Sequence, residues 1–138
     1  MVWYTTGMEV VGAVIKNQSD EYLLQQRDEN APTFKHYWTL FGGRVEEGEK
    51  PAEALLRELD EELALTPRNI LSFELTQTNT DRVGIVQYIY EIATDVQLDQ
   101  LTLSEGEAMQ YVPEATLFDR KFAFNIQEVL ARSIKQNR

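Results

Sequence analysis

The stretch from Gly43 to Leu65, GRVEEGEKPAEALLRELDEELAL, constrains this chain most, because a turn rich in glycine and carboxylates runs directly into an amphipathic helix. From Pro51 onward, apolar residues recur at three- and four-residue steps, which places them on one helical face. They are Ala52, Leu55, Leu56, Leu59 and Leu63. We expect this face to be part of the core.

Three carboxylates of the same helix, Glu58, Glu61 and Glu62, fall within an arc of about 100° away from the leucines. Like charges at this spacing repel and raise one another's pKa, so a positive partner is expected to offset them. Ligation by oxygen alone suits Mg²⁺, with Mn²⁺ as a second choice. The alternative is a solvated acidic helix face, which is how we interpret Glu53 and Asp60.

Arg57 is a second positive partner for this acidic stretch. Its position predicts an ion pair with Glu49 in the preceding turn, which would hold the loop and the helix together.

The spacing of these residues resembles the Nudix box, the signature of the Nudix hydrolase family. That signature reads Gly, five residues, Glu, seven residues, Arg-Glu, apolar, any, Glu-Glu, any, Gly, apolar. The matching residues are Gly43, Glu49, Arg57, Glu58, Leu59, Glu61, Glu62 and Leu65. The last glycine is replaced by Ala64, which costs about 1 kcal/mol if φ is positive there and nothing if the helix continues.

The resemblance implies a fold, a reaction and a set of site residues. The fold is an α/β/α sandwich with a mixed β-sheet, formed by residues 1–138 as a single domain. The reaction is Mg²⁺-dependent attack of water on a phosphorus of a diphosphate. By position, Glu58, Glu61 and Glu62 match the family's metal-binding glutamates, and the carbonyl of Gly43 matches its loop ligand.

Later in the chain, Glu105 resembles an extra metal ligand that MutT-type members supply from a loop, with Glu107 as its competitor. The proton acceptor is left open between the box glutamates and Glu105. The substrate implied by default is a nucleoside triphosphate or a nucleotide sugar. A second hypothesis is a non-catalytic Nudix-fold module that binds a nucleotide or regulates another process.

Composition limits the partners of the chain. The 138 residues suit one domain, and the formal net charge of −10 disfavours binding to nucleic acid or anionic membranes. The start of the chain shows neither a secretory signal nor a membrane anchor, and cysteine is absent. We therefore expect a cytoplasmic monomer or homodimer that acts on a small molecule.

Cations and aromatic residues before the box are candidates for substrate binding. Arg27 ends an apolar strand and could contact a phosphate. Phe34, Tyr37 and Trp38 could stack on a base, although aromatic residues at this density more often pack in the core. The predicted substrate contacts are Arg27, Phe34 and Trp38. A lone loop histidine such as His36 usually has no part in binding or catalysis.

A β-branched, apolar run followed by turn residues predicts a first hairpin, and alternation of apolar and polar residues predicts a second. A short apolar run predicts a later strand. The predicted strands are Met8–Lys16, Tyr22–Arg27, Ile70–Thr80, Val83–Glu91 and Met109–Val112. Val96–Leu103 is either a strand or an extended loop. Phe118–Ser133 is predicted to form the closing amphipathic helix.

Overall fold

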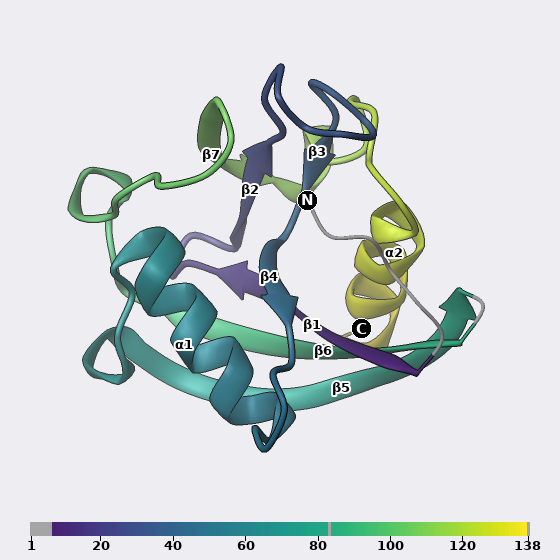
Figure 1. The fold of residues 1–138 in the computed structure, drawn as a ribbon. Coiled ribbons are helices and arrows are strands. Elements are labelled where there is room, and N and C mark those ends of the chain that lie inside the picture. Colours follow the sequence, from purple (N-terminus) through teal and green to yellow (C-terminus); the bar gives the residue numbers. More distant parts are fainter. Residues whose placement is uncertain (1–6, 83, 138) are drawn as a thin grey trace.

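A seven-stranded mixed sheet with one helix on each face forms the core of the computed structural model, which describes residues 7–82 and 84–137 (Figure 1). The strands are Met8–Lys16 (β1), Glu21–Gln26 (β2), Trp38–Thr39 (β3), Phe41–Arg44 (β4), Ile70–Arg82 (β5), Ile85–Thr94 (β6) and Ala108–Pro113 (β7). The helices are Pro51–Leu63 (α1) and Ile126–Gln136 (α2). The predicted α/β sandwich is confirmed.

Strand β1 is the centre of the sheet and makes it mixed. It runs parallel to β6 along its whole length and antiparallel to β4 at Val10–Ala13. It pairs with β2 at the hairpin end, between Lys16 and Tyr22. Strand β2 then continues into pairs with β3 and β7. Because β4 and β2 take different parts of β1, the two strands are free to separate, and the candidate site lies between them.

The two faces of the sheet carry separate cores, as the period of two along a strand requires. On β1, Val11, Ala13 and Ile15 pack with the α1 leucines. Val14 packs on the other face with residues of α2. Leu55, Leu59 and Leu63 have no exposed surface, whereas Ala52 and Leu56 of the predicted apolar face are only partly buried.

Helix α1 begins at Pro51, a position where the missing N–H of proline costs nothing. The Glu53 carboxylate accepts a hydrogen bond from the Lys50 N–H at 2.8 Å, so Glu53 stabilises the helix start and is more than a solvent charge. The helix ends at Ala64, which has φ 56° and donates its N–H to the Asp60 carbonyl. The replaced glycine therefore stands in the left-handed conformation, where alanine is disfavoured.

Helix α2 begins later than the sequence pattern over Phe118–Ser133 predicted, and that prediction is corrected here. The residues before α2 are bonded to β3 instead: the Trp38 N–H donates to the Lys121 carbonyl, and the Ala123 N–H donates to the Trp38 carbonyl. Phe124 has φ 53°, which interrupts any helix that would start before it.

Smaller differences concern the strand ends. Strand β5 runs through Asp81-Arg82, which was predicted to be the turn, and β6 extends to Thr94. Val83, the predicted start of that strand, lies outside the described residues. Val96–Leu103 forms no strand and contains a 3₁₀ turn at Leu98–Gln100.

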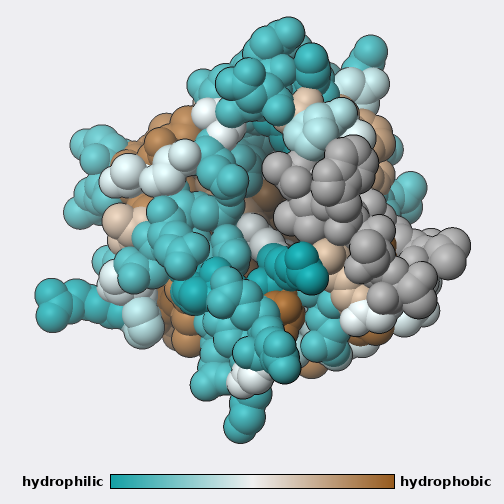
Figure 2. All heavy atoms as spheres, in the orientation of Figure 1, coloured by the Kyte–Doolittle hydropathy of each residue, from teal (hydrophilic) through white to brown (hydrophobic). Residues whose placement is uncertain are grey.

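Hydrophilic residues cover most of the surface on the α1 side in the view of Figure 2. Within residues 7–82 and 84–137, no helix combines the length and the apolar character needed to cross a bilayer.

The left-handed end of α1 leads to a stability prediction. Ala64→Gly should raise the free energy of unfolding by about 1 kcal/mol, because glycine adopts φ 56° without the Cβ penalty. Urea unfolding measures this difference. Ala52→Gly, inside the same helix, is the matched control and should lower stability by about 0.5–1 kcal/mol. A loss of stability in both variants would contradict the account of Ala64.

Candidate active site

A cavity of about 510 Å³ lies between β2, β4, the C-terminal half of α1 and the loop before β7. Five residues that the sequence singled out line it: Arg27, Gly43, Glu58, Glu62 and Glu105. Phe34, Trp38, Glu49, Arg57 and Glu61 do not belong to its lining. The cavity thus divides the predicted residues into those that face it and those that support it.

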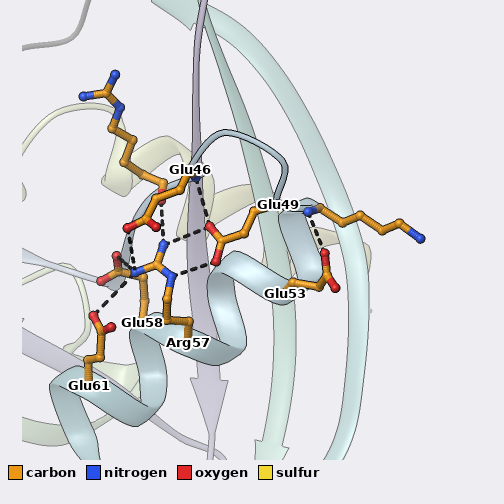
Figure 3. A network of polar contacts seen from close by, with 8 residues as sticks. Glu46, Glu49, Glu53, Arg57, Glu58 and Glu61 are labelled. Carbon is orange, nitrogen blue, oxygen red and sulfur yellow. Dashed lines mark hydrogen bonds and ion pairs between the residues drawn. The ribbon is translucent and has the colours of Figure 1, made fainter.

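Arg57 is the main support, because its guanidinium contacts both the loop and the helix (Figure 3). Nε and Nη2 donate to the two carboxylate oxygens of Glu49 at 2.7 and 3.0 Å, and Nη2 also donates to the Arg44 carbonyl at 3.0 Å. Nη1 donates to Glu58 at 2.9 Å and to Glu61 at 3.4 Å. These bonds hold the loop between β4 and α1 against the helix, next to Gly43 in β4.

The same contacts set the charge state of Glu49. The hydrogen bonds from Arg57 and from the Glu46 N–H lower the pKa of Glu49 from 4.5 to about 2. The pKa of Arg57 is raised in turn, mainly by Glu49. Both side chains are therefore ionised at neutral pH.

Glu62 is the deepest carboxylate of the site, with 4% of its surface exposed. Its Oε1 accepts a hydrogen bond from the Gly42 N–H at 3.1 Å. Burial, followed by the hydrogen bond and the charge of Glu105 and the charge of Glu58, raises the pKa of Glu62 to about 10. At neutral pH, with only protein groups around it, this carboxyl group carries a proton.

Glu58 lies directly against Gly43. A Cβ placed on Gly43 would be 2.5 Å from Cδ of Glu58, so no side chain fits at position 43 while Glu58 keeps this position. Burial raises the pKa of Glu58, and Arg57 partly opposes this shift. Glycine at position 43 keeps the space beside the Glu58 carboxylate and the loop backbone clear.

The loop that carries Glu105 is attached to the end of α1. The Thr102 N–H donates to the Leu63 carbonyl at 2.9 Å, and the Ser104 N–H donates to the Glu62 carbonyl at 3.1 Å. Carbonyl groups in the last turn of a helix have no partner within the helix, so this loop satisfies them. The attachment brings Glu105 to Glu62, although the two are distant in sequence.

Glu107, the competitor of Glu105, points elsewhere and bonds to His36. Its Oε1 is 2.9 Å from His36 Nδ1, and Glu29 is 2.7 Å from His36 Nε2. The two carboxylates raise the pKa of His36, with Glu107 contributing most. Of the two alternatives, Glu105 is the one at the cavity.

The aromatic residues before the box pack within the fold. Phe34 contacts Phe124 with ring centroids 4.9 Å apart, and Arg120 lies over Trp38 at 5.1 Å. Neither Phe34 nor Trp38 lines the cavity, and Phe34 keeps 41% of its surface exposed, so their contact with substrate stays a prediction. Phe124, which Arg27 covers at 5.1 Å, lines the cavity instead.

Sequence reasoning also missed polar residues of the lining, among them Gln25, Arg44 and Gln87. Arg44 had a signal, because it follows the paired glycines in a chain of net charge −10. The two glutamines had none, since an amide on a strand reads as an ordinary polar residue.

The donors at the acidic end of the cavity are oxygens only, as Mg²⁺ or Mn²⁺ requires. Within the part of the chain that the structure describes, no three acidic or histidine side chains already form a metal-ligand cluster. Glu58 and Glu61 turn toward Arg57, whereas Glu62 turns toward Gly42 and Glu105. Glu58 and Glu62 nevertheless share one wall with Gly43, and this arrangement fits a divalent cation.

The Glu49–Arg57 pair leads to a pH prediction. Because the folded pKa of Glu49 lies below 4.5, its contribution to stability is complete above pH 4.5 and is lost as the pH falls toward 2. Glu49→Gln should therefore melt a few degrees below the wild type at pH 7, and the gap should close on acidification. Thermal melts from pH 7 to pH 2 measure it. Glu47→Gln, an exposed neighbour, should show no such gap; a constant gap in Glu49→Gln would contradict the pair's role.

Comparison with known proteins places this geometry in a family. The family model described as the NUDIX domain matches residues 7–133. The chain is 31% identical over 67 residues to the 8-oxo-dGTP diphosphatase of Escherichia coli (strain K12), covering 49% of this chain and 51% of that protein. It is 36% identical over 61 residues to the RNA pyrophosphohydrolase of Acidiphilium cryptum (strain JF-5), covering 44% and 37%. The matches thus span about half of the first relative and less of the second.

The fold comparison covers the full length. The crystal structure of the MutT protein from Methanosarcina mazei Go1 superimposes with a TM-score of 0.74 at 22% identity, covering 99% of both chains. This likeness supports the fold, and the match of the family model over residues 7–133 includes the box, the cavity and the Glu105 loop. The chain belongs to the Nudix family.

Proposed function

We propose that this protein is a Mg²⁺-dependent hydrolase of a nucleoside diphosphate linked to another group, such as a nucleoside triphosphate or a nucleotide sugar. One observation carries the proposal: Glu58, Glu62, Glu105 and Gly43 line the same cavity as Arg27 and Arg44. Water would attack a phosphorus of the diphosphate. Mn²⁺ is the alternative cation.

The residues that would hold the cation are Glu58, Glu62 and the carbonyl of Gly43, with Glu61 and Glu105 as additional carboxylates. When bound, the cation would stabilise charge on the phosphoryl oxygens and make a nearby water more nucleophilic. Glu105 and the box glutamates are the groups that can accept the proton from that water. Arg57 keeps Glu58 and the loop in place through its bonds to Glu49 and the Arg44 carbonyl.

The phosphate groups need positive partners in an acidic protein, and Arg27 and Arg44 on the cavity wall supply them. The cavity is also lined by Gln87, Ile89 and Ile126, which together offer an amide and apolar surface. Such a wall suits an uncharged organic group, as in a nucleoside. The names of the two partial relatives support a nucleotide substrate.

A hydrolysis screen tests the proposal directly. The purified protein is incubated with Mg²⁺ and with nucleoside triphosphates, oxidised nucleotides, nucleotide sugars, ADP-ribose and dinucleoside polyphosphates, and the products are identified to locate the broken bond. Cleavage of the diphosphate in at least one class is expected. Tight binding of a nucleotide without any product would instead favour a non-catalytic binding module.

Glu62→Gln provides the sharpest test by mutation. We expect turnover to fall by about a hundredfold or more, because a neutral amide replaces a carboxylate that holds the cation. Without metal, the melting temperature at pH 7 should stay equal or rise. The folded pKa of about 10 lies above the ordinary 4.5, so above pH 4.5 folding requires this carboxyl group to take up a proton, at a cost that grows with pH, and glutamine removes this cost.

Asp60→Asn is the matched control for Glu62→Gln. Asp60 is exposed on the same helix and does not line the cavity, so this substitution should leave turnover unchanged. Full activity in a folded Glu62→Gln protein would contradict the assigned role of Glu62.

A further inference from the structure

Gln25 on β2 is a buried amide that separates the two halves of the candidate metal site. Only 7% of its surface is exposed, and it lines the cavity. On one side of it lies β4 with Gly42 and Gly43, and on the other lies the loop that carries Glu105. An amide in this position is costly to bury unless its hydrogen-bonding groups are used.

One side of the Gln25 amide holds the first half of the site. Nε2 donates to the Leu40 carbonyl at 3.1 Å. Leu40 stands in the break between β3 and β4, directly before Phe41, Gly42 and Gly43. This bond therefore fixes the chain where it enters β4, the strand whose Gly42 N–H binds Glu62.

The other side of the amide contacts the second half. A Cβ placed on Gly106 would lie 2.8 Å from Gln25 Oε1 and 2.6 Å from the Gln26 carbonyl oxygen, and Gly106 has φ +83°. The Glu107 N–H donates to the same Gln26 carbonyl at 2.9 Å. The loop next to Glu105 thus rests on β2, with Gln25 Oε1 as part of the contact surface.

Gln25 also keeps unused hydrogen-bonding capacity. Among residues 7–82 and 84–137, the side chain of Gln25 makes one hydrogen bond, from Nε2 to the Leu40 carbonyl. Its Oε1 and the second N–H of Nε2 make none within these residues. Because the bond to Leu40 fixes the orientation of the amide, Oε1 faces the Glu105 loop. A neutral oxygen adds no further negative charge beside Glu58, Glu62 and Glu105, whereas glutamate at this position would.

We propose that Gln25 is a positioning residue that sets the separation between Gly42 and Gly43 of β4 and the Glu105 loop, and thereby the affinity of the site for a divalent cation. This inference rests on the proposed function, because it concerns the same metal site. Groups that orient metal ligands without touching the metal change metal affinity or activity by about 10- to 100-fold when they are mutated.

The test compares Gln25→Met with Gln26→Met. Methionine keeps the length of the side chain and removes both the donor and the acceptor. The side chain of Gln26 bonds to the His36 carbonyl at 2.9 Å, outside the cavity lining, so its loss is the matched control. Binding of Mn²⁺ alone is measured for each protein, together with kcat, KM and the Mg²⁺ concentration at half-maximal activity.

We expect Gln25→Met to weaken Mn²⁺ binding and raise the half-maximal Mg²⁺ concentration by about tenfold, and to lower kcat more than it changes KM. Gln26→Met should match the wild type in each measurement. Equal Mn²⁺ affinity in the two variants would overturn the role of Gln25. Absence of hydrolysis by the wild type would refute the proposed function alone, since the Mn²⁺ comparison can still be read.

Gly106→Ala provides a second variant in case Gln25→Met does not fold. The added Cβ would push the loop away from Gln25 from the opposite side, and a similar loss of Mn²⁺ affinity is expected. If the folded Gly106→Ala protein binds Mn²⁺ as the wild type does, the contact with Gln25 does not set the site and the proposal is wrong.

Discussion

The arrangement of this site depends on one guanidinium group. Arg57 forms a two-point ion pair with Glu49, a bond to Glu58 and a bond to the Arg44 carbonyl. A planar group with several fixed donors can satisfy a loop carboxylate, a helix carboxylate and a backbone carbonyl together, which a lysine could not do. Without this cation, the acidic loop and the acidic helix would repel each other, and Glu58 would lose the partner that holds its carboxylate beside Gly43.

Helix α1 has three tasks at once. Its leucine face fills the core between the helix and the sheet, its opposite side carries the carboxylates, and its last carbonyls hold the loop of Glu105. The divergence of β2 from β4 leaves room for the cavity above this helix. The site is therefore built by secondary-structure geometry, and only a few side chains, such as Gln25, adjust the distance between its walls.

Sequence reasoning found the parts of this structure that depend on local spacing. The period of the leucines located α1, and the run of β-branched and apolar residues over Met8–Lys16 located β1 with the same bounds. The start of α2 was misplaced because the backbone of Trp38 takes the preceding residues into a long-range pairing that no local pattern records. Local spacing also gave no sign that Phe124, and not Phe34 or Trp38, lines the cavity. Whether an aromatic ring faces a cavity or the core is decided by the packing of distant segments.

The attachment of Thr102 to the Leu63 carbonyl has a consequence for variation in the fold. The chain leaves α1 after Leu63, forms β5 and β6, and returns to the end of the same helix, so both ends of this segment are held at α1. Insertions at the outer end of that hairpin would change its reach while both ends stay fixed at the helix. A one-residue insertion between Glu58 and Glu62, in contrast, would rotate Glu62 relative to Glu58 by about 100° and displace the returning loop with it. The length of the helix is therefore constrained, whereas the outer end of the β5–β6 hairpin can vary in length.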